Sequence, residues 1–186
     1  MNGYIILGVV ILIIIILVAW IIITYNNLVQ LRNKVKDQWS QVDVQLKKRF
    51  DLIPNIVETV KGYAKHEKDT LKDIVAVRNG DYDKLSQNEK IKTNEQINRG
   101  ISRLLALAEN YPDLKANENF LSLQAELSGI EDEIAQSRKY YNAVVREFND
   151  KVEMIPSNIV AKTLGYNSKE MFIAEESEKK SIKVKL

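Results

Sequence analysis

The most restrictive feature of this chain is an uncharged apolar run near its start, from Tyr4 to Ile23. Ile, Leu and Val fill most of its positions, and the first charged side chain in the sequence is Arg32. As an α-helix rising about 1.5 Å per residue, the run is about 30 Å long, the thickness of the hydrocarbon core of a bilayer. A helix also satisfies its own backbone hydrogen bonds in lipid. The sequence therefore predicts a membrane span from Tyr4 to Ile23.

A cleaved secretory signal is the alternative explanation of this run. Such a signal has a basic start, an apolar stretch of about 7 to 15 residues and a cleavage site with small side chains. The residues Met1 to Gly3 include no Lys or Arg, the apolar run is longer, and no A-x-A-like site follows Trp20. We therefore expect the span to stay in the mature protein, with Trp20 and Tyr25 close to the membrane interface.

Basic residues follow the run but do not precede it. Those that follow closely are Arg32, Lys34, Lys36, Lys47, Lys48 and Arg49. By the positive-inside rule, the sequence predicts a single-pass protein whose C-terminal domain lies in the cytoplasm.

Composition restricts the rest of the chain. Only three prolines and seven glycines occur, which favours helices over many short strands. A net charge of +2 from mixed signs gives no reason to expect a nucleic-acid partner, which usually meets a clustered basic face. The chain has no cysteine, which excludes disulfides, thiolate metal sites and cysteine nucleophiles.

Apolar side chains recur at helical spacing over most of the chain after the span. The first stripe predicts a helix that continues the span as far as the turn at Asn79-Gly80-Asp81, with a kink and no break at Pro54. A capping box, Ser86 to Glu89, predicts the start of a second helix that ends at Tyr111-Pro112. The first stripe is Leu28, Val35, Trp39, Val42, Leu46, Phe50, Ile53, Val57, Val60, Ala64, Leu71 and Ile74, and the second is Ile97, Ile101, Leu104, Ala108 and Tyr111.

A third helix shows a seven-residue rhythm and should end before Pro156. A short fourth helix fits Ser157 to Leu164, with Ser157 as its N-cap and Gly165 just beyond its end. The last residues, Ile182 to Leu186, alternate with period two, typical of an edge strand or docking peptide, but a frayed terminus is the preferred interpretation. The seams of the third helix are Phe120, Leu127, Ile134, Tyr141, Phe148 and Ile155, with Leu123, Ile130 and Val144.

Together these patterns predict an all-α fold, in which a transmembrane helix continues into an antiparallel bundle of three main helices and a short fourth. We expect an anchor at residues 1–24, a bundle at 25–165 and a tail at 166–186. Seven-residue seams look alike within and between chains, so the coiled-coil stripes allow packing against a second copy as well.

No sequence motif for catalysis is complete. His66-Glu67 begins like a zinc-protease H-E-x-x-H motif, but Thr70 stands in place of the second histidine. Asp81-Tyr82-Asp83 begins like a calcium loop but lacks its later ligands, so a turn is expected. Walker, Rossmann and nucleophile-elbow motifs are absent. We therefore expect no catalytic, cofactor-binding or metal-binding residues, and no small-molecule ligand is indicated.

Several segments resemble the LemA family: Tyr25–Val29, Val35–Arg49, Asp51–Asn55, Val60–Ala64, Tyr111–Lys115, Phe120–Leu127, Arg138–Asn142 and Phe172. The resemblance implies a bacterial single-span membrane protein with an antiparallel helical bundle, similar also to a magnetosome membrane protein. The family has no established catalytic residues to transfer.

The residues singled out for interaction or structure lie in these matching segments: Trp39, Arg49, Asp51, Pro54, Tyr111, Pro112, Tyr141 and Asn142. The simpler interpretations are a solvated Lys47-Lys48-Arg49 face, a local charge pair at Asp51, a kink at Pro54 and aromatic core positions. Lipid headgroups for the basic run and a partner groove for the others are the alternatives.

Three functions fit the sequence. The leading hypothesis is a non-catalytic scaffold in the bacterial cell membrane, which holds copies of itself or other membrane proteins. The alternatives are an enzyme or accessory subunit with a carboxylate or metal site between helices, and an assembly that remodels membranes.

Overall fold

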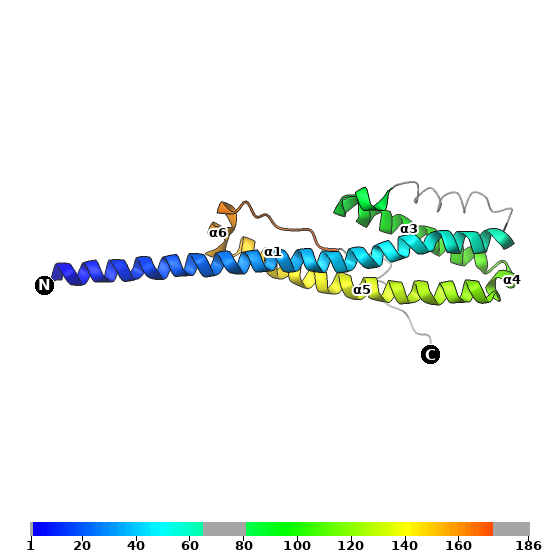
Figure 1. Ribbon diagram of the computed structural model, residues 1–186, viewed down its shortest axis with the longest axis horizontal. Helices are drawn as coiled ribbons and strands as arrows, with labels where there is room; N and C mark the ends of the chain where they lie inside the picture. The colour runs from blue at the N-terminus through cyan, green and yellow to red at the C-terminus, as the bar shows by residue number, and fades with distance from the viewer. Residues whose placement is uncertain (1, 65–80, 173–186) are drawn as a thin grey trace, which may run out of the picture. The chain divides into compact units, whose positions relative to one another are not determined.

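The computed structural model describes residues 2–64 and 81–172, and all regular structure in these two stretches is helical (Figure 1). The all-α prediction is therefore confirmed. The elements are α1 (Asn2–Tyr63), the 3₁₀ turn η1 (Tyr82–Lys84), α3 (Gln87–Ala108), α4 (Pro112–Lys115), α5 (Glu118–Glu153) and α6 (Ser157–Thr163).

Helix α1 joins the apolar run to the first predicted bundle helix without interruption. It passes through Pro54 without breaking, as expected. The prediction that it continues to Asn79 is wrong at Ala64, which is not helical. The Ala64 N–H donates the last hydrogen bond of the helix, to the Val60 carbonyl. Gly62 lowers helix propensity in the last turn, which favours an end there. Leu71, Ile74 and the His66 motif lie outside the described residues.

The apolar segment of α1 is exposed along nearly its whole length. The large apolar side chains from Tyr4 to Ile23 lie at or near the surface, and most of them are about half exposed or more. In the described part of the chain, α1 is the one helix long and apolar enough to cross a membrane.

The chain divides into two compact units. The first contains the chain up to Trp39 and from Arg138 onward, and the second contains Ser40–Ser137. In the second unit, Arg49 of α1 contacts Glu131 of α5, and Tyr63 contacts Asn117 next to the start of α5. As the residue number increases along α1, the number of its partner near α5 decreases. The two helices are therefore antiparallel within this unit.

The core of the second unit is built largely from residues of the predicted apolar stripes. Helix α3 begins with the predicted capping box, because the Ser86 hydroxyl accepts from the Glu89 N–H and the Glu89 carboxylate accepts from the Ser86 N–H. The hydrogen bond from the Ser86 hydroxyl lowers the pKa of Glu89. The buried apolar residues include Val42, Leu46, Phe50, Ile53, Val57 and Val60 of α1, Ile97, Ile101 and Leu104 of α3, and Phe120, Leu127, Ile130 and Ile134 of α5.

In the first unit, α6 packs on α1. Leu28 of α1 forms a buried cluster with Val160 and Ala161 of α6, and Trp20 packs against this cluster. The predicted N-cap at Ser157 is wrong: Pro156 holds that position, and the Ser157 hydroxyl donates to the Met154 carbonyl. Gly165 follows α6 with φ +68°, the left-handed conformation that ends many helices.

The seven-residue rhythm of α5 holds as far as Phe148 and then fails. Tyr141 and Phe148 are buried, but Ile155 is 82% exposed. Because α5 ends at Glu153, Ile155 no longer follows the helical register that carried the earlier seam positions inward.

Candidate functional site

The structure places the eight candidate residues in three separate groups. Arg49, Asp51 and Pro54 lie on α1 in the second unit. Trp39, Tyr141 and Asn142 lie in the first unit, whereas Tyr111 and Pro112 form the start of α4. The candidates are therefore divided between the two units.

Arg49 is fully buried, which corrects the predicted solvated face of Lys47-Lys48-Arg49. Its guanidinium forms an ion pair with Glu131 of α5 and donates to the Asn98 side-chain oxygen of α3. It also donates to the Asn94 carbonyl at 3.1 Å. Successive helical residues differ in direction by about 100°, so the three basic side chains cannot all face the solvent when one face packs against α3 and α5. Arg49 thereby links three helices of the unit.

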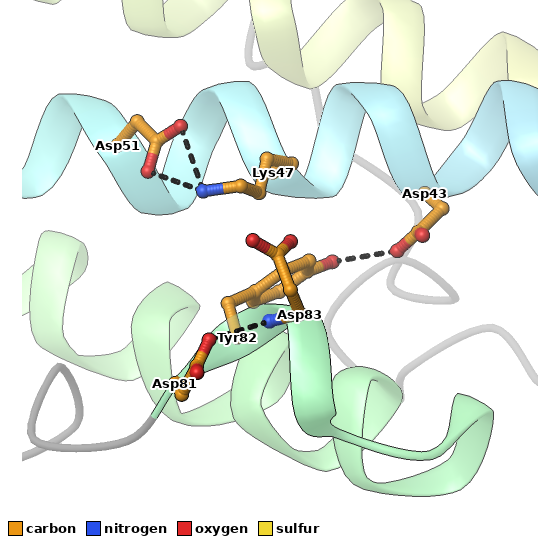
Figure 2. A network of polar contacts seen from close by, with 6 residues as sticks. All are labelled: Asp43, Lys47, Asp51, Asp81, Tyr82 and Asp83. Atoms are coloured by element: carbon orange, nitrogen blue, oxygen red, sulfur yellow. Dashed lines mark hydrogen bonds and ion pairs between the residues drawn. The ribbon is translucent and has the colours of Figure 1, made fainter.

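A second polar network holds η1 against α1, and Figure 2 shows its hydrogen bond between Tyr82 and Asp43. The Tyr82 hydroxyl donates to Asp43 at 3.0 Å, and Lys90 of α3 forms an ion pair with the same carboxylate at 2.7 Å. The Lys90 ammonium also lies 4.8 Å from the centre of the Tyr82 ring. Burial, and then the Asp43 charge, raise the pKa of Tyr82 far above its usual value, so its hydroxyl stays protonated as a donor.

Asp51 forms the local charge pair that the sequence predicts. Lys47 Nζ lies 2.9 Å from Asp51, one turn along α1, and the hydrogen bond to Asp51 raises the pKa of Lys47 (Figure 2). Asp51 also borders an open groove of about 680 Å³ in the second unit. The groove is lined by Gln45, Lys48, Asp51, Leu52, Asn55, Glu126, Gly129, Ile130 and Glu133.

In the first unit, an aromatic cluster binds the chain segment that follows α6. Trp39 stacks on Phe172 with ring centres 5.9 Å apart, and the Tyr141 ring meets both at steep angles. The Arg138 guanidinium lies 5.0 Å from the centre of the Phe172 ring. Phe172 therefore sits in a pocket built by α1 and α5.

Two asparagines on α5 hold the backbone of the same segment, residues 166–172, which we call the strap. Asn142 donates to the Phe172 carbonyl and accepts from the Phe172 N–H, both at 2.8 Å. Asn149, two helical turns later, makes the same pair of bonds with Lys169 at 2.9 and 2.8 Å. Each amide thus completes the hydrogen bonding of an extended backbone that belongs to no helix or sheet.

Tyr111 and Pro112 have a local role. Tyr111 is the N-cap of the four-residue helix α4 and Pro112 is its first residue, a position where the missing N–H of proline costs nothing. Leu114 of this helix is completely buried. The pair therefore turns the chain from α3 into α5.

Sequence reasoning missed Glu131, Asn98, Asp43, Tyr82 and Lys90, because partners from distant elements leave no local pattern. It named Asn142 but missed Asn149. Their seven-residue separation beside the buried seam of α5 was an available signal. In residues 2–64 and 81–172, no group of three or more His, Asp or Glu side chains is placed to hold a metal ion.

Comparison with known proteins gives the family. The LemA family model matches residues 38–186. Protein LemA of Metamycoplasma hominis is 30% identical over 158 residues, which cover 83% of this chain and 71% of the relative. Magnetosome protein MamQ 2 of Paramagnetospirillum magneticum is 22% identical over 83% of this chain and 66% of its own length. Magnetosome protein MamQ of Magnetospirillum gryphiswaldense is 20% identical over 90% of this chain and 71% of its own. The chain belongs to the LemA family.

Proposed function

We propose that this protein is a membrane-anchored, non-catalytic scaffold that holds copies of itself, or other membrane proteins, at the cytoplasmic face of the membrane. One observation supports it above all: the exposed apolar segment and the first bundle helix are a single helix, α1. Exposed apolar surface on this scale needs lipid or protein to cover it. A helical connection also transmits position more rigidly than a loop.

The helical surfaces support a binding role more than a chemical one. The described residues combine an open groove, an aromatic pocket filled by the strap and structural ion pairs. The alternative of a metal site between helices gains no support from residues 2–64 and 81–172, where no group of three or more acidic or histidine side chains is placed to hold a metal ion.

Two measurements on the full chain test the proposal. Membranes from expressing cells are washed at alkaline pH, and the protein should stay in the pellet, because a spanning helix resists such extraction. In mild detergent, light scattering should then give a protein mass well above the 21.4 kDa of one chain, or defined membrane proteins should copurify. Release into the alkaline supernatant would contradict the anchor. A monomer without any copurifying protein would contradict the scaffold.

A further inference from the structure

Three large apolar side chains are exposed where α5 turns into α6. Met154 is 61% exposed, Ile155 82% and Ile159 62%. They lie within six residues of one another, while Val160 and Ala161 on the other face of α6 are buried. We call Met154, Ile155 and Ile159 the apolar corner. Grouped apolar exposure of this kind marks a surface that meets another apolar phase.

The packing of α6 fixes the level of this corner along α1. Val160 and Ala161 form a buried cluster with Leu28, and Trp20 packs against that cluster. Trp20 lies within the apolar segment, and Leu28 lies five residues beyond Ile23, which corresponds to about 7.5 Å along a helix. The headgroup layer extends about 5 to 8 Å beyond the hydrocarbon core. With Tyr4 to Ile23 in the core, α6 therefore packs on α1 at headgroup depth.

We infer that the apolar corner is a second membrane-contacting element, whose side chains enter the interfacial layer of the leaflet into which α1 emerges. This inference rests on the proposed anchoring by α1. The occupant is the lipid bilayer, because α6, which carries Ile159, packs on α1 at the depth where amphipathic elements bind membranes. A stable protein interface buries about 800 Å² on each partner, and three side chains are a small fraction of that area.

The absence of cysteine makes a direct depth measurement practical. Single-cysteine variants Ile155→Cys and Ile159→Cys of the full chain carry a nitroxide label in lipid nanodiscs. Tyr140→Cys is the matched control, because Tyr140 is 61% exposed and the adjacent Tyr141 contacts Trp39, about 24 Å beyond Ile23 along α1. Circular dichroism checks that each labelled variant keeps its helix content.

We expect collisions with a water-soluble nickel complex to fall at least threefold at 155 and 159 relative to 140, and collisions with oxygen, which concentrates in lipid, to rise. Equal nickel access at 155 and 140, in protein that still resists alkaline extraction, would contradict membrane contact by the apolar corner but not anchoring by α1. Protection from nickel without increased oxygen collisions would indicate a protein partner and would also contradict membrane contact by the apolar corner. Release of the protein by alkali would contradict both anchoring by α1 and membrane contact by the apolar corner.

Discussion

At the scale of single residues, burial changes the meaning of Arg49. The guanidinium charge of Arg49 is removed from water, so it must be stabilised by protein groups. These include the Glu131 carboxylate and the oxygens of Asn98 and Asn94. Breaking a buried ion pair from one side is costly because a charge remains without compensation, whereas an apolar replacement of similar size removes that charge. The two halves of the pair are therefore not equivalent.

This asymmetry gives a first prediction. Glu131→Gln should lower the free energy of unfolding by about 2 to 3 kcal/mol, since Arg49 stays buried and charged. Arg49→Met should cost less, about 1 kcal/mol, because Glu131 can turn toward water. Urea unfolding of the full chain in detergent, followed by circular dichroism, measures both. A larger loss for Arg49→Met than for Glu131→Gln would refute this account.

Tyr82 gives a second prediction, one that depends on pH. At pH 8, Tyr82→Phe should cost about 2 kcal/mol, because it removes a hydrogen bond to the charged Asp43. The pKa of Tyr82 is raised in the folded protein, so above about pH 10 the unfolded chain ionises while the folded chain does not. Stability from this hydroxyl is complete below pH 10 and is lost as the pH rises further.

The difference in unfolding free energy between wild type and Tyr82→Phe should therefore shrink by about 1 kcal/mol from pH 10 to pH 11. Urea titrations at each pH measure it. Tyr140→Phe, an exposed tyrosine on α5, controls for removal of a hydroxyl and should change stability at pH 8 by less than about 0.5 kcal/mol. A constant cost for Tyr82→Phe across this range would contradict the assigned role.

At the scale of elements, the sequence predicted those parts that depend on local patterns. The seam of α5 from Phe120 to Phe148 and the Ser86 capping box follow from spacing alone. The position of the strap does not, because it depends on contacts with residues distant in the sequence. For the strap, those contacts are side-chain amides that replace a neighbouring strand, which no periodicity reveals.

The strap supports a third prediction. Its residues from 167 to 171 are exposed, so the Asn142 and Asn149 bonds contribute much of what holds it. Asn142→Ala with Asn149→Ala should speed tryptic cleavage after Lys169 by about tenfold, as expected for a loss of about 1.4 kcal/mol. Mass spectrometry of timed digests measures the rate. Asn119→Ala, an exposed asparagine near the start of α5, should leave the rate unchanged. Equal rates in all three proteins would show that the amides do not retain the strap.

At the scale of the whole molecule, the family match and the apolar segment are separate signals. The LemA match begins at residue 38, after the run from Tyr4 to Ile23 has ended. The bundle is thus what the chain has in common with the family model, and the anchor follows from hydrophobicity alone. The sequence did not show against what the apolar side chains are buried. The stripe on α1 and the seam on α5 are compatible both with packing within one chain and with packing between two copies.

The orientation of the molecule is the last prediction. Because Lys and Arg follow the apolar run but do not precede it, residues after Ile23 should face the cytoplasm. In the cysteine-free chain, Tyr140→Cys should react with a membrane-impermeant maleimide only after cells are permeabilised, whereas Asn2→Cys should react in intact cells. A shift in gel mobility after labelling with a large maleimide measures the reaction of each cysteine. Reaction of both cysteines after permeabilisation confirms that each is accessible. Labelling of Tyr140→Cys in intact cells would reverse the orientation and, with it, place the apolar corner in the outer leaflet.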